Sequence, residues 1–155
     1  MSVRTEYFKL LTIFIVGGFS YGLIEVLARG YTHISMGILG GAAMCLIHLL
    51  NIEKRTPARL FLLFSVSSLF ITLCELVTGE IVNKQLGLAV WDYSMMPLNY
   101  DGQICLSFSL IWFALSAVGV WLDDFLRLKI FSESRRVMWL NDKSKEKENE
   151  KAIVH

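Results

Sequence analysis

The stretch that decides the fold class is residues 34–52, ISMGILGGAAMCLIHLLNI, which contains no formal charge. A helix needs about 20 mainly apolar residues to cross the hydrocarbon core of a bilayer. Three further stretches have the same character: 10–28, 60–82 and 103–122. The first holds Glu25, the second holds Glu75 and Glu80, and the third is free of charge. The sequence therefore predicts an all-α membrane protein built as a bundle of four transmembrane helices.

The composition excludes several classes of protein. Of the 155 residues 54% are hydrophobic, and the mean hydropathy is +0.51. A soluble domain carries about 25% charged residues, whereas this chain has 19%, and 15 of its 29 charged residues fall in 123–155. This excludes a soluble enzyme and a nucleic-acid binder with a basic face. The cysteines Cys45, Cys74 and Cys105 lie in apolar runs, so we expect reduced thiols rather than a disulfide framework.

The distribution of Lys and Arg predicts the orientation. With the N-terminus inside, thirteen of the fifteen basic residues are cytoplasmic, and only Arg29 and Lys84 lie outside. This is the bias expected of cytoplasmic loops, so both termini are predicted to be cytoplasmic. The transmembrane domain spans 1–122. Residues 123–140 mix apolar and basic side chains and predict an amphipathic helix at the cytoplasmic interface, and the charged tail 141–155 is predicted to be disordered.

Small residues repeat at helical spacing within the spans. Gly18 and Gly22 are four residues apart, as are Gly37 and Gly41. Helices in lipid associate through such small residues. Tight packing within the chain is the favoured interpretation, and homodimerisation is the alternative.

Polar residues gather at the outer end of the predicted bundle. Glu25 and Glu75 reach similar depths, and Arg29 follows Glu25 by one helical turn, the spacing of an ion pair. Ionisable residues inside the membrane are costly and point to function. We therefore predict one outer-facing polar pocket. Its residues are Glu25, Arg29, His33, Glu75, Asn83, Trp91, Asp92, Tyr93, Ser94, Asn99 and Gln103.

Three interpretations of this pocket remain open. In the first, the pocket is a satisfied structural network, in which Glu25 pairs with Arg29 and Glu75 bonds Thr72 or Thr78. Alternatively it is a binding or translocation site for a cation, proton or polar headgroup, or a catalytic site with a carboxylate base. His48, near the inner end of its span, is expected to pack or snorkel.

Motifs for other chemistry are not found in the sequence. No metal-ligand spacing and no cofactor motif are present, so neither a metal nor a cofactor is expected. The phosphate-binding glycine loop and the nucleophile elbow are also missing from the sequence, so the chain is not expected to hydrolyse ATP by itself.

Residues 91–112, WDYSMMPLNYDGQICLSFSLIW, carry a resemblance to a known family. The Trp-Asp-Tyr-Ser run, Pro97, Asn99 and the Gly-x-Ile-Cys-Leu segment resemble the signature of a bacterial integral membrane family, the putative ABC transporter type IV (CmpB-like) proteins. In that family pattern Glu25 matches the acidic residue of the first helix, Arg29-Gly30 follows it, and Glu75 matches the acidic residue before the loop. The resemblance covers roughly residues 18–125. Residues 29–37 lack the proline that the family often carries there.

The resemblance implies a permease-like, multi-pass protein of the bacterial inner membrane that handles a small polar or charged solute. Transport would require an ATPase or another membrane subunit, and so small a permease is expected to form a homo-oligomer. Two alternatives remain. One is an envelope enzyme acting on a lipid or cell-wall intermediate at the outer leaflet, and the other is a membrane interaction or sensor protein.

Overall fold

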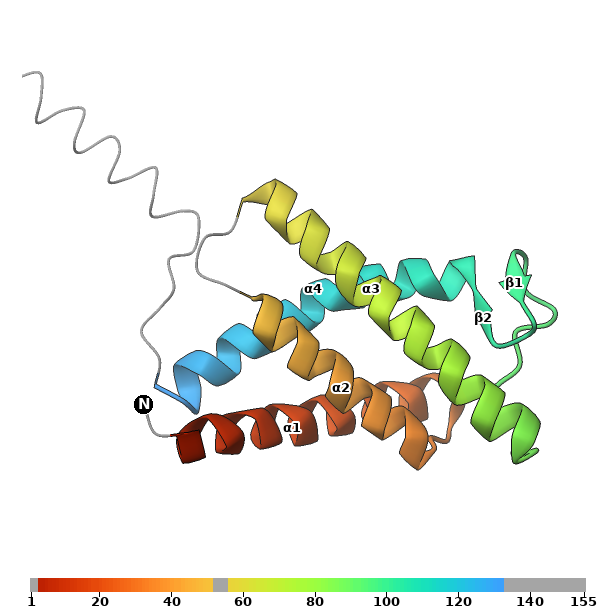
Figure 1. The fold of residues 1–155 in the computed structure, drawn as a ribbon, viewed down its shortest axis with the longest axis horizontal. Coiled ribbons are helices and arrows are strands. Elements are labelled where there is room, and N and C mark those ends of the chain that lie inside the picture. Colours follow the sequence, from red (N-terminus) through yellow and green to blue (C-terminus); the bar gives the residue numbers. More distant parts are fainter. Residues whose placement is uncertain (1–2, 52–55, 133–155) are drawn as a thin grey trace, which may run out of the picture.

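The computed structural model describes residues 3–51 and 56–132 (Figure 1). In this part of the chain four α-helices follow one another: α1 (Val3–Arg29), α2 (Ile34–Leu50), α3 (Pro57–Gly79) and α4 (Leu106–Lys129). A π-helix, η1 (Glu80–Gln85), directly extends α3. Strands β1 (Asn99–Tyr100) and β2 (Ile104–Cys105) form an antiparallel pair just before α4. The mostly helical architecture confirms the all-α prediction.

Three of the described helical segments are long and apolar enough to cross a membrane: Glu6–Arg29, Pro57–Gln85 and Leu106–Lys129. The apolar helix α2 has 17 residues, the lower limit of the spanning range, so its crossing of the membrane stays a prediction. Helix α4 continues past residue 122, and residues 123–129 of the predicted interfacial helix belong to it. Residues 133–140 of that helix, and the tail 141–155, lie outside the described residues.

Helix α2 contacts the other three helices, with α1 as its most extensive neighbour, and α3 packs on α4. The α1–α2 contact depends on glycine. A Cβ on Gly18 would lie 2.6 Å from the carbonyl oxygen of Gly37, and a Cβ on Gly41 would lie 2.7 Å from that of Phe14. The small residues therefore let two backbones meet within the chain, as the favoured interpretation of the sequence predicts.

The bundle has two distinct ends. The loop end carries residues 80–105, where α3 ends and α4 begins, and the last turn of α1 reaches it (Figure 1). The terminal end carries the start of α1 and the last turns of α2 and α4 (Figure 1). Trp91 packs at the loop end with Met36, Val82 and Val90, so this tryptophan belongs to a small core that fixes the loop on the helices.

Candidate functional site

Two buried carboxylates lie at the loop end. The exposed fraction is 7% for Glu25 and 1% for Glu75. Glu25 accepts hydrogen bonds of 2.5 Å from the guanidinium of Arg29 and from the hydroxyl of Thr32. The predicted Glu25–Arg29 ion pair is therefore confirmed. The charge of Glu25 is therefore compensated locally, by Arg29 one turn later on α1 and by Thr32 in the connection between α1 and α2.

The partners of Glu75 come from distant parts of the chain. One carboxylate oxygen accepts a 2.9 Å bond from the hydroxyl of Tyr93, and the other accepts a 2.9 Å bond from the indole N–H of Trp112. The expectation that Thr72 or Thr78 would bond Glu75 is wrong, since Thr72 instead bonds the hydroxyl of Ser109 on α4. Both donors to Glu75 are neutral, and within the described residues no cationic side chain forms an ion pair with it.

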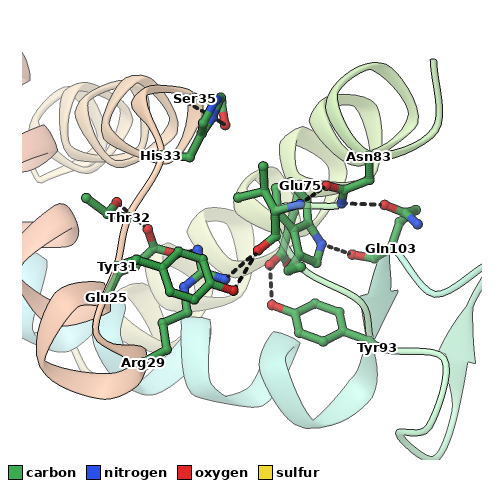
Figure 2. A network of polar contacts seen from close by, with 12 residues as sticks. Glu25, Arg29, Tyr31, Thr32, His33, Ser35, Glu75, Asn83, Tyr93 and Gln103 are labelled. Carbon is green, nitrogen blue, oxygen red and sulfur yellow. Dashed lines mark hydrogen bonds and ion pairs between the residues drawn. The ribbon is translucent and has the colours of Figure 1, made fainter. Parts of the chain in front are cut away.

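Hydrogen bonds fasten the loop over these carboxylates (Figure 2). Arg29 and Tyr31 both donate to the carbonyl oxygen of Val90, at 3.0 and 3.3 Å. The amide group of Asn83 accepts a 2.7 Å bond from the backbone N–H of Val90 and donates a 2.9 Å bond to the side-chain oxygen of Gln103. The loop is therefore held by side chains of α1 and η1 as well as by Tyr93.

Two loop side chains have shifted pKa values. Burial, with the negative charge of Glu75 as a smaller cause, raises the pKa of the Tyr93 phenol. Hydrogen bonds from Ser94 lower the pKa of Asp92, whose carboxylate accepts a 2.8 Å bond from the backbone N–H of Ser94. At neutral pH the loop thus presents an ionised Asp92 to the solvent side and a neutral phenol to Glu75.

A polar pocket of about 510 Å³, here called the loop pocket, opens in the loop itself. Six predicted site residues line it: Asn83, Trp91, Asp92, Ser94, Asn99 and Gln103. Lys84 and Asp101 also line the loop pocket and form an ion pair with each other. The sequence analysis did not include these two among the predicted pocket residues.

Four of the five remaining predicted residues form a second group. Glu25, Arg29, Glu75 and Tyr93 do not line the loop pocket, and the buried Glu25 and Glu75 with the partly buried Arg29 and Tyr93 are here called the carboxylate layer. The structure thus divides ten of the eleven predicted residues between two compartments.

His33 belongs to neither compartment. Its ring nitrogen Nδ1 caps α2 by accepting a 3.3 Å bond from the backbone N–H of Ser35. It also lines an apolar groove of about 590 Å³ between α1 and α2, whose lining includes neither Glu25 nor Glu75. Within residues 3–51 and 56–132 no group of three or more His, Cys, Asp or Glu side chains could hold a metal ion.

Sequence reasoning missed a buried polar cluster at the terminal end. Asp123, with an exposed fraction of 0%, bonds His48 at 2.6 Å, Asn51 at 2.6 Å and Arg127 at 2.8 Å. Arg127 also donates to the carbonyl oxygen of His48. The signal was present, since Asp123 and Arg127 repeat the one-turn spacing of Glu25 and Arg29.

The chain belongs to the family described as "Putative ABC-transporter type IV", whose model matches residues 12–140. No curated protein and no solved structure matches the chain. The match agrees with the family resemblance carried by residues 91–112. Together with the apolar helices, it establishes a membrane protein of a family named for transport.

Proposed function

We propose that the chain is a permease-like component of a transport system for a small polar or charged solute. In this proposal the solute enters by the loop pocket, and an ATPase or another membrane subunit supplies the energy, because the chain has no ATP-binding motif of the glycine-loop type. The protein lies in the bacterial inner membrane with both termini in the cytoplasm. Residues 1–122 form the membrane domain, 123–140 the interfacial segment and 141–155 the tail.

The observation that carries the proposal is the stacking of two polar compartments at one end of an apolar bundle. Tyr93 stands between them, since its backbone N–H bonds Gly102 at the wall of the loop pocket and its hydroxyl bonds Glu75 below. A buried carboxylate with neutral donors costs stability, and a purely structural role would be met more cheaply by an apolar side chain.

Native mass spectrometry of the tagged protein, purified in mild detergent, tests the partner. We expect a complex of fixed stoichiometry with an ATPase or another membrane subunit. A monomer or homo-oligomer that carries one tightly bound lipid would overturn the transport proposal and favour the envelope enzyme.

A stability screen tests the site. The full-length protein is heated with a panel of small polar and charged solutes, because a ligand that binds the folded state raises the unfolding temperature. We expect the stabilising solute to lose its effect in Glu75→Gln and in Asp92→Asn. The matched control is Glu80→Gln, a change at the half-exposed acid of η1. A solute shift that survives both site variants would count against the proposed site.

A further inference from the structure

Glu75 lies beside a continuous row of aromatic rings. Tyr93 stacks on Phe108 with ring centroids 4.5 Å apart, Phe108 lies 6.2 Å from Trp112, and Trp112 lies 5.5 Å from Tyr21. Tyr93 and Trp112 also donate the two hydrogen bonds that Glu75 accepts. A carboxyl group therefore lies at the edges of two rings whose faces attract cations.

Arg29, the cationic residue of the carboxylate layer, is already paired with Glu25. Arg29 bonds Glu25 and the carbonyl oxygen of Val90, and its guanidinium lies 4.7 Å from the centre of the Tyr31 ring. Glu75 is therefore left without an ion-pair partner in the described part of the chain. When ionised, Glu75 attracts a cation over more than contact distance in this low-dielectric interior.

A small cavity adjoins the aromatic row. It has a volume of about 100 Å³, its walls are almost wholly apolar, and Tyr21 and Trp112 line it together with Ser116 and Gly119. It reaches the surface between α1 and α4, where the lining residues Ile24 and Val118 are exposed. Cavities of comparable size bind small apolar molecules.

We propose that this aromatic–carboxylate site binds the quaternary ammonium group of a small organic cation. A quaternary ammonium has no N–H group, so it needs no hydrogen-bond acceptors from an apolar wall. Its methyl groups suit the cavity lined by Tyr21 and Trp112, and its charge is attracted by their ring faces and by Glu75. A metal ion or primary ammonium would need several oxygen ligands, more than a wall whose only side-chain oxygens are the hydroxyl groups of Ser20, Tyr21 and Ser116 supplies.

The proposal rests on the proposed function and names the substrate class of that site. It adds that the carboxylate layer, rather than the loop pocket, selects the charge of the solute.

Calorimetric titration of the full-length protein in detergent tests the inference with choline as the probe. The matched ligand is 3,3-dimethyl-1-butanol, which replaces the quaternary nitrogen of choline by carbon and so removes the charge with little change of shape. We expect choline to bind saturably and about tenfold or more tighter than the neutral alcohol. Equal affinities, or no choline binding, would overturn the inference.

Two variants locate the binding. Glu75→Gln should weaken choline binding about tenfold or more by removing the charge, and Trp112→Phe should weaken it less, by shrinking one ring face. Trp121→Phe is the control, since Trp121 lies on the same helix and is 66% exposed. If Glu75→Gln does not fold, Trp112→Phe decides. Choline binding that is unchanged in the folded variants would overturn the inference.

Failure of this inference is distinguishable from failure of the proposed function. If a subunit complex forms and a different solute stabilises the protein through Glu75, only the quaternary ammonium is wrong. If choline binds as expected but no partner subunit is found, the transport assignment is wrong and the site stands.

Discussion

One hydroxyl, that of Tyr93, joins the loop to the carboxylate layer. Tyr93→Phe keeps the ring stacked 4.5 Å from Phe108 and removes the donor to Glu75. We expect a loss of about 1–3 kcal/mol in the free energy of unfolding, because a buried carboxylate loses a partner. Denaturant unfolding in detergent measures it. Tyr100→Phe, at a tyrosine that is 65% exposed, should change little, and equal losses in the two variants would contradict the prediction.

The same phenol predicts a loss of stability at alkaline pH. Its folded-state pKa is raised by burial and by Glu75, whereas an unfolded tyrosine titrates near pH ~10. The native state therefore holds this proton more tightly, and the contribution is complete below pH ~10 and declines above it. Unfolding free energies at neutral and alkaline pH should show a steeper decline in the wild type than in Tyr93→Phe. Parallel declines would show that Tyr93 does not contribute.

At the scale of elements, Gly18 and Gly22 of α1 differ in how closely they approach the chain around α2. Gly18→Ala would place a methyl group 2.6 Å from the backbone of Gly37, whereas Gly22→Ala meets nothing closer than 3.8 Å. We expect Gly18→Ala to cost about 1–3 kcal/mol through overpacking. Gly22→Ala should be neutral or slightly stabilising because alanine favours helix. Thermal unfolding of both variants measures this, and similar melting temperatures would contradict it.

The approximate positions of the helices were predictable because each depends on the hydropathy of a contiguous stretch of sequence. Apolar runs with at most two charges gave the spans. The third was predicted to start at residue 60, whereas α3 begins at Pro57, where the Thr56 side chain caps it. The boundary at residue 122 was not predictable in the same way. The sequence ended the fourth span there and began a separate interfacial helix at Asp123, whereas α4 runs unbroken to Lys129. Within α4 the buried Asp123 is bonded by His48, Asn51 and Arg127.

The candidate site shows the same contrast between features set by local sequence and features set by long-range contacts. The Glu25–Arg29 pair lies within one turn of one helix, so its spacing predicted it. The donors to Glu75 are 18 and 37 residues away in sequence. Their choice depends on how α3 meets α4 and on the path of the loop, which no local pattern encodes. Residue types therefore indicated a polar end, while its division into two compartments required the fold.

At the scale of the whole molecule, buried charge is placed at both ends of the bundle. Asp123 joins α2 to α4 at the terminal end. Asp123→Asn should destabilise the protein by about 3–5 kcal/mol, since it removes the buried negative charge that accepts bonds from His48, Asn51 and Arg127 and puts an amide NH2 among these donors. Unfolding in detergent measures the loss. The control Asp101→Asn breaks an ion pair on the exposed loop, where such pairs contribute about 0–1 kcal/mol, and a loss for Asp123→Asn no larger than this would contradict the prediction.

Helix α2 decides how many times the chain crosses the membrane. Its 17 residues span about 26 Å at 1.5 Å per residue, slightly less than a hydrocarbon core of about 30 Å, a mismatch that local thinning of the bilayer accommodates. We therefore expect Ile34→Cys and Met95→Cys, exposed by 75% and 95%, to react with an impermeant maleimide in intact cells. Thr56→Cys, beyond the other end of α2, should react only after permeabilisation, and the unsubstituted chain gives the background. Because residues 34 and 56 flank α2, labelling of both from outside would show that α2 does not cross, while the reversed pattern would invert the proposed orientation.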